Sequence, residues 1–245
     1  MRKPRIFLTE LLLKDSEYQL SKQASQHITK VLRLKAGDVL TLFDGNGWFV
    51  DAKISNKGGK LTCVETLEEP ARSAVPNINI HLGLAISKGD RMDYAIQKSV
   101  EAGVNVITPL LTERTVIKLD DKRTQTRHEH WQGIIVNACE QCGQNYLPTL
   151  QTATGLADWC GLSNDSLKLV FDTNATQTLY DLQPQQNIQI VIGPEGGLAQ
   201  TELDLLQRAG FIGVRMGPRV FRSETAAVSA CVMLQTLWGD YRNSK

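Results

Sequence analysis

Apolar and polar positions alternate along residues 37–69 in three short runs, which are separated by the segments DGNG and NKGG. Alternation with a period of two is typical of half-buried strands, and both separating segments are rich in residues that tolerate positive φ. The pattern therefore predicts a three-stranded meander. With a strand at 5–8 and a helix within 24–35, it predicts a small β-rich domain over residues 1–70.

A segment with two prolines and little apolar content, 68–77, follows this domain and is typical of a linker. Beyond it, short β-branched apolar runs are separated by segments of helical periodicity. Met92, Ile96 and Val100, for example, share one face of the first predicted helix. The predicted helices are 89–102 and 124–142, and the predicted strands are 77–86, 104–111, 166–173, 187–193 and 211–217.

Apolar residues occupy nearly every position of these predicted strands. Strands of this kind are buried on both faces, and their alternation with helices indicates a parallel sheet that is covered on both sides. We therefore expect an α/β domain over residues 76–245.

The composition is that of a globular protein, with 42% hydrophobic and 22% charged residues among 245. No apolar stretch reaches the roughly 18 residues of a membrane span, and the N-terminus lacks the apolar core of a signal peptide. We therefore expect a cytoplasmic protein without membrane contact. Cys139 and Cys142 form a C-x-x-C, but the other three cysteines supply no second ligand pair, so we expect no metal site.

Charge is unevenly distributed along a chain whose net charge is only +1. Residues 1–35 carry eight lysines and arginines against three acidic residues. A basic segment of this kind indicates either a surface that binds phosphates or a solvated face without a partner. Composition alone does not distinguish the two.

The segment GPEGG, 193–197, follows a predicted buried strand and precedes a predicted helix. Ligands of α/β sheets bind where strands end and helices begin. The spacings of a P-loop and of a dinucleotide fingerprint are absent, and Glu195 would repel a pyrophosphate. The loop is therefore either a tight connection without a ligand or a site for a ligand without phosphates, such as S-adenosylmethionine. For the helix that follows, Thr201 and Asp204 resemble a capping box, and Gly210 suits its C-terminal end.

A second loop, carrying Arg219 and Arg222, precedes an almost wholly apolar helix. Ser223 is a candidate N-cap, and Glu224 would be favoured by the helix dipole. A helix without a polar face is buried on all sides, here within a subunit interface, which would leave its entry loop at the edge of a crevice.

A polar stripe accompanies the apolar face of the predicted helix 124–142. It consists of Asn137, Glu140, Gln141 and Gln144. Amides and carboxylates in this arrangement either face solvent or hydrogen-bond to a base or a ribose.

Taken together, four segments resemble the RsmE family, which methylates N3 of a uridine in the 16S ribosomal RNA of the small subunit. They are KGDRMDYAIQKSVEAGV (88–104), ACEQCG (138–143), IGPEGG (192–197) and MGPRVFRSETA (216–226). The N-terminal RKPRIF and HITKVLRLKAGD look like the PUA-like domain of this family, so the resemblance covers nearly the whole chain. One departure is Gln144, where close relatives commonly carry arginine.

The resemblance implies an α/β fold: a SPOUT-type methyltransferase domain with a knotted parallel sheet over 76–245, its trefoil knot at the C-terminal end. It also implies a small N-terminal β-barrel, the PUA-like RNA-binding domain, over 1–70. The partners would be 16S ribosomal RNA in the small ribosomal subunit and a second copy, bound through the C-terminal domain. The implied contacts to S-adenosylmethionine come from Phe171, Asp172, Gly193, Pro194, Glu195, Gly196, Met216, Gly217, Val220 and Phe221. The implied RNA contacts come from Arg2, Arg5, Lys30, Arg33, Arg114 and Gln141.

The chemistry of this reaction suggests two catalytic residues. Uridine N3 is a poor nucleophile until its imide proton leaves, so a fixed cation near the uracil carbonyls would stabilise the anion. We expect Arg222 in this role and Glu224 as the proton acceptor. Two alternatives remain open: a SPOUT enzyme that methylates a ribose 2′-hydroxyl, and a non-catalytic RNA-binding factor of ribosome assembly.

Overall fold

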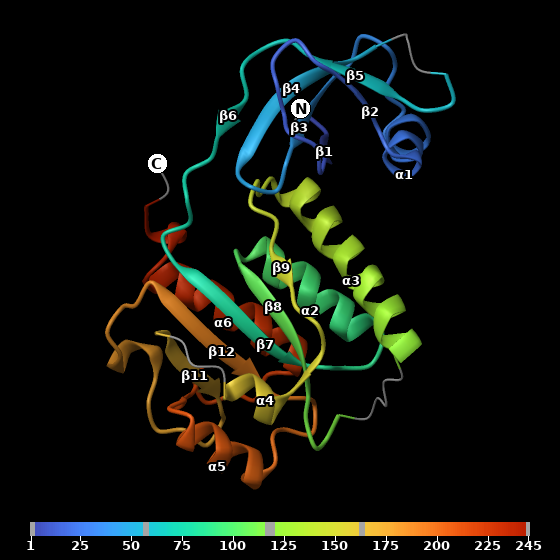
Figure 1. Ribbon diagram of the computed structural model, residues 1–245. Coiled ribbons are helices and arrows are strands. Elements are labelled where there is room, and N and C mark those ends of the chain that lie inside the picture. Colours follow the sequence, from blue (N-terminus) through green and yellow to red (C-terminus); the bar gives the residue numbers. More distant parts are fainter. Residues whose placement is uncertain (1–2, 56–58, 116–120, 162–164, 244–245) are drawn as a thin grey trace. The chain divides into compact units, whose positions relative to one another are not determined.

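The computed structural model describes residues 3–55, 59–115, 121–161 and 165–243 (Figure 1). The chain forms two compact units, one of Met1–Val75 with Cys139–Leu147 and one of Pro76–Ala138 with Pro148–Lys245. The domain limits expected from the sequence place 139–147 in the second domain, whereas this segment packs with the first unit.

The N-terminal unit is built on a six-stranded sheet that curls into a half-barrel, with the strand order β1-β3-β4-β5-β2 and with β6 paired to β4. The strands are β1 (Arg5–Phe7), β2 (Glu17–Gln19), β3 (Val39–Phe43), β4 (Trp48–Ile54), β5 (Cys63–Thr66) and β6 (Ala71–Arg72). The antiparallel strands β3, β4 and β5 confirm the predicted meander, and β1 confirms the strand predicted at 5–8. Neither β2 nor β6 was predicted, because each is too short to show a period.

The predicted helix within 24–35 has different limits in the structure. A short helix, α1 (Lys22–Gln26), leads into a π-helical turn, η1 (His27–Val31). The helix begins earlier because the Ser21 hydroxyl accepts a hydrogen bond from the backbone N–H of Ala24 at 3.1 Å. The helical stretch is over before Arg33, which has φ +55°.

The C-terminal unit contains a seven-stranded sheet whose pairs are all parallel, with the order β10-β8-β7-β12-β11-β13 and with β9 paired to β8. Its strands are β7 (Asn79–Ala85), β8 (Val106–Leu111), β9 (Thr149–Leu150), β10 (Thr154–Gly155), β11 (Leu167–Phe171), β12 (Asn187–Ile192) and β13 (Ile212–Val214). The five strands predicted from apolar runs are all confirmed. The two-residue strands β9 and β10 were not predicted.

Helices cover both faces of this sheet, as predicted (Figure 1). They are α2 (Asp90–Glu101), α3 (Asp121–Cys142), α4 (Leu156–Cys160), α5 (Gln200–Arg208) and α6 (Ser223–Leu237), with the 3₁₀ turns η2 (Leu179–Asp181) and η3 (Asp240–Asn243). Helix α6 packs against α2 and contacts β7 and β12, whereas α4 and α5 cover the opposite face. Met92, Ile96 and Val100 are fully buried, as their spacing predicts. None of the helices that the structure describes has the length and apolar character of a membrane span.

Helix α5 is capped differently from the prediction. Ala199 is the N-cap residue, and the Glu202 carboxylate accepts a hydrogen bond from its backbone N–H at 2.9 Å. The capping box predicted from Thr201 and Asp204 is therefore wrong. The C-terminal prediction is confirmed, because Gly210 follows the last turn with φ +87°, a conformation that glycine adopts without strain.

Candidate active site

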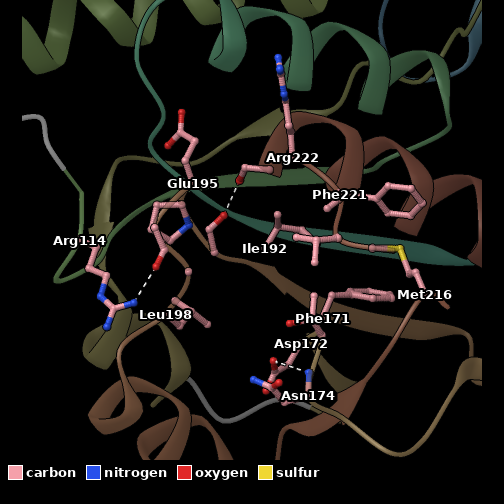
Figure 2. Close-up of a pocket in the computed structure, with 18 of the residues that line it drawn as sticks. Arg114, Phe171, Asp172, Asn174, Ile192, Glu195, Leu198, Met216, Phe221 and Arg222 are labelled. Carbon is pink, nitrogen blue, oxygen red and sulfur yellow. Dashed lines mark hydrogen bonds between the residues drawn. The ribbon is translucent and has the colours of Figure 1, made fainter. Parts of the chain in front are cut away.

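Loops that follow β11, β12 and β13 enclose a cavity of about 700 Å³ at the carboxyl edge of the sheet (Figure 2). This volume lies within the ~300–1,000 Å³ typical of small-molecule sites. All ten residues predicted to contact a methyl donor line it: Phe171, Asp172, Gly193, Pro194, Glu195, Gly196, Met216, Gly217, Val220 and Phe221. The structure therefore brings together three segments that the sequence separates by tens of residues.

Polar contacts from neighbouring segments hold the glycine loop in place (Figure 2). Arg114, which follows β8, donates a hydrogen bond to the Gly196 carbonyl at 2.6 Å, and the Ser223 hydroxyl donates one to the Gly193 carbonyl. A side chain at position 193 would bring its Cβ within 3.0 Å of Leu198 Cγ. The loop is thus fixed through its own carbonyls, and glycine permits the close approach.

The loop after β11 is also ordered by hydrogen bonds. The backbone N–H of Asp172 donates to the Val214 carbonyl at 3.0 Å, and the Asp172 carboxylate accepts from the backbone N–H of Asn174 at 3.0 Å. Phe171, directly before this turn, contributes an aromatic ring to the cavity wall (Figure 2). Across the cavity, Gly217 has φ +100°, so a side chain there would be strained. The combined lining offers apolar flanks, a carboxylate and closely approaching backbone.

Helix α6 begins at the edge of the cavity, but its cap differs from the prediction. Arg222 is the N-cap residue, and Ser223 is the first helical residue with its hydroxyl committed to the glycine loop. The prediction of Ser223 as N-cap is therefore wrong. Arg222 lines the cavity and is exposed, whereas Glu224 is not among the lining residues. One carboxylate oxygen of Glu224 is buried and finds no hydrogen-bond partner within the described part of the chain.

Arginine dominates the charge around the cavity. The lining includes Arg91, Arg114, Arg219 and Arg222, together with two acidic residues, Glu195 and Asp172. Arg91 lies in the first turn of α2, and its guanidinium forms an ion pair with the Glu195 carboxylate at 2.9 Å. Arg91 was not among the residues predicted to form the site. The signal that could have found it is its place five residues after the end of the predicted strand 77–86, at the same edge of the sheet as the glycine loop.

The residues expected to bind RNA lie in different environments. Arg2 lies outside the described residues. Arg5 lies over the Phe43 ring at 5.0 Å and donates a hydrogen bond to the Asn145 side chain, so intramolecular contacts occupy much of its guanidinium. Lys30, Arg33 and Gln141 are exposed. Lys30 also lines a second cavity, of about 710 Å³, in the N-terminal unit together with Lys22 and Lys60.

The polar stripe at the end of α3 divides into two parts. Asn137 and Gln141 are exposed, whereas Glu140 and Gln144 are partly buried. Glu140 hydrogen-bonds to the backbone of Phe7, and Gln144 to that of Tyr146. The Glu140 carboxylate accepts from the backbone N–H of Phe7 at 3.1 Å, and burial raises the pKa of this carboxyl. These two polar residues therefore stabilise the N-terminal unit.

Comparison with known proteins agrees with this architecture. A family model described as an RNA methyltransferase domain matches residues 74–235, and one described as an RNA methyltransferase PUA domain matches residues 20–65. The fold and the cavity thus define an RNA methyltransferase of the SPOUT class with an added PUA domain.

Individual relatives narrow this class to one family. The Ribosomal RNA small subunit methyltransferase E of Buchnera aphidicola is 35% identical over 98% of this chain and 95% of its own. The enzyme of the same name from Neisseria gonorrhoeae, solved with S-adenosyl methionine, is 35% identical with a TM-score of 0.91, over 98% of this chain and 100% of its own. The Legionella pneumophila protein Lpg2936, solved with its bound cofactor SAM, is 36% identical with a TM-score of 0.94 and the same coverage. The chain belongs to the Ribosomal RNA small subunit methyltransferase E family.

Proposed function

We propose that this protein transfers a methyl group from S-adenosylmethionine to N3 of a uridine in the 16S ribosomal RNA of the small subunit. The observation that carries the proposal is the cavity between the glycine loop and the loops after β11 and β13, in a chain whose relatives bind this donor. A substrate in ribosomal RNA would place the protein in the cytoplasm.

The residues present fit the donor. Phe171, Ile192 and Leu198 offer apolar surface for a purine ring, and the Asp172 carboxylate can accept hydrogen bonds from a ribose. Glu195 supplies a negative charge near a ligand whose sulfonium is positive. The donor, when bound, supplies the electrophilic methyl group. The trefoil knot expected from the resemblance stays a prediction.

Two residues at the start of α6 would act on the target base. The exposed Arg222 guanidinium, at the cavity edge, would stabilise the negative charge that uracil gains when N3 loses its proton. Glu224 would accept that proton, directly or through a water molecule. Its buried carboxylate oxygen without a partner supports this role, because a donor that reaches it would relieve an unfavourable desolvation.

We assign the N-terminal unit to RNA binding. It matches a PUA domain model and exposes Lys30 and Arg33, and phosphate contacts by such side chains would position the target nucleotide. The target base must be unstacked or single-stranded for its N3 edge to reach the cavity.

We further propose a homodimer formed through the C-terminal domain. Residues 226–237 of α6 carry no charge and are almost all small or apolar, yet Val232 and Thr236 are exposed along one side of the helix, with Val232 38% exposed. A second copy of the chain would cover this side. Val232→Asp should then shift the sedimentation coefficient from dimer to monomer, and a monomeric parent protein would contradict the assignment.

The decisive experiment uses radiolabelled S-adenosylmethionine and small ribosomal subunits that lack their methylations. Nucleoside analysis of the product should find 3-methyluridine. Label on a ribose 2′-hydroxyl would instead establish the alternative SPOUT reaction, and absence of both label transfer and donor binding would leave a non-catalytic assembly factor. Glu224→Gln with undiminished turnover would remove Glu224 as the proton acceptor.

A further inference from the structure

The cavity lining carries more positive charge than binding of the methyl donor requires. Four arginines line it against the carboxylates of Glu195 and Asp172. S-adenosylmethionine carries two positive groups and one carboxylate, so it is itself a net cation. A surplus of guanidinium groups does not favour such a ligand. The surplus instead suits the polyanionic substrate.

Arg91 is the arginine whose placement is most informative. It is the second residue of α2, six residues after the end of the central strand β7, which pairs with the β12 strand that precedes the glycine loop. Its guanidinium contacts Glu195 at 2.9 Å, and the two side chains are 49% and 35% exposed. An ion pair this exposed stabilises a fold by at most about 1 kcal/mol, and often by nothing measurable.

The glycine loop does not depend on this weak pair. Arg114 already binds the Gly196 carbonyl, and Ser223 binds the Gly193 carbonyl. Glu195 uses its side chain, not its backbone, to contact Arg91. The pair can therefore open without releasing the two carbonyl contacts. In Figure 2 the Glu195 and Arg222 side chains project toward the same side, away from Phe171 and Met216.

We propose that Arg91 binds a phosphate of the RNA next to the methylated nucleotide, and that the Glu195 carboxylate occupies the place of that phosphate in the free protein. The inference rests on the proposed function. A planar guanidinium binds carboxylate and phosphate with the same two-pronged geometry, so one can replace the other. The exchange is favourable because a phosphate contact also releases counterions from the RNA, which an internal carboxylate cannot do.

The test compares two variants of this pair with matched variants of a second ion pair. Arg91→Gln and Glu195→Gln each remove one charge from the proposed exchange. Lys98→Gln and Glu101→Gln remove the same charges from a pair at the other end of α2, at 2.7 Å, which does not line the cavity. Affinity for unmethylated 16S ribosomal RNA is measured without donor at several salt concentrations, and donor affinity is measured by calorimetry without RNA.

Arg91→Gln should weaken RNA binding about tenfold, the loss expected for one charge-assisted contact. It should also reduce the slope of log K against log salt by about 0.7–0.9. Donor binding should not weaken, because the variant removes a positive charge from a cavity whose ligand is a net cation. Glu195→Gln should tighten RNA binding about two- to fivefold, because it removes the competing carboxylate. The two control variants should change RNA affinity less than either.

The opposite results would overturn the proposal. If Arg91→Gln weakens donor binding and leaves RNA binding intact, the ion pair of Arg91 with Glu195 serves to hold the glycine loop in place for the donor. If Glu195→Gln weakens RNA binding or leaves it unchanged, no exchange takes place. Failure of the proposed function is a separate observation, because it would appear as absent donor binding and absent methyl transfer in the unaltered protein.

Discussion

Lowering the pH should destabilise this protein through one partly buried histidine, His81 on β7. Its ring nitrogen Nε2 lies 2.7 Å from Thr108 Oγ1 and 3.4 Å from Trp159 Nε1, and the His81 and Trp159 rings meet edge-on at 5.3 Å. An indole N–H can only donate, so Nε2 accepts, as it does in a neutral imidazole. Burial lowers the pKa of His81 to about 4 from its ordinary value of 6.5.

The direction of the effect follows from proton counting. Between pH 6.5 and 4 the unfolded chain binds a proton at this position that the folded protein does not bind, so the free energy of unfolding falls as the pH falls. With these two pKa values the loss between pH 7.5 and pH 5 is about 2 kcal/mol, and it approaches about 3 kcal/mol below pH 4. Above pH 7 this contribution is constant.

Urea denaturation of the parent protein and of His81→Gln at pH 7.5 and pH 5 would measure the contribution of His81 to the free energy of unfolding. Glutamine preserves an acceptor near the position of Nε2 but does not titrate. The parent should therefore lose about 2 kcal/mol more than the variant between pH 7.5 and pH 5. If the two proteins lose stability in parallel, or if the His81 ring resonance titrates near pH 6.5 in the folded state, His81 does not cause the loss of stability.

Three further outcomes are expected. Gly47→Ala should destabilise the N-terminal unit by more than about 2 kcal/mol, because Gly47 has φ +96° and a Cβ there would lie 2.5 Å from the Tyr146 ring. Gly59→Ala is the control in the same urea assay, since a Cβ at position 59 would have no atom within 4 Å. Ser223→Ala should raise the Kd for S-adenosylmethionine about fivefold in calorimetry, since it removes the hydrogen bond to the Gly193 carbonyl. An unchanged Kd would show that donor binding does not depend on this hydrogen bond. Affinity for ribosomal RNA should fall steeply between 50 and 200 mM salt, whereas a flat response would indicate that the basic N-terminal segment is a solvated face.

Apolar spacing located the long elements because burial imposes a period on every strand or helix that spans the core. Five of the seven strands of the C-terminal unit, the face of α2 and the meander of the N-terminal unit were all found in this way. The same signal failed for β2, β6, β9 and β10, which have two or three residues each. The three-residue strands β1 and β13 were still found, because each lies within a longer apolar run. The other short strands are specified by the strand they pair with, and that partner is not a local property of the sequence.

In the candidate site, too, local backbone features could be predicted from the sequence, whereas contacts between distant side chains could not. Its glycines and its positive-φ positions are local requirements of the backbone, so the loop at 193–197 and the end of α5 at Gly210 could be read from residue types. The role of Ser223 could not, because its hydroxyl has two possible partners and only the folded chain brings the Gly193 carbonyl to it.

The sequence alone predicted the order of the main strands and helices and the glycine loop, and its resemblance to the RsmE family implied the segments that form the cavity. Tertiary structure alone decided which charges meet there: it pairs Arg91 with Glu195 and packs residues 139–147 with the N-terminal unit. The physical reason is how far apart in the sequence the interacting residues lie. Backbone conformation and burial period are set by neighbours along the chain, whereas ion pairs and side-chain hydrogen bonds depend on distances of a few ångströms between residues that only folding brings together.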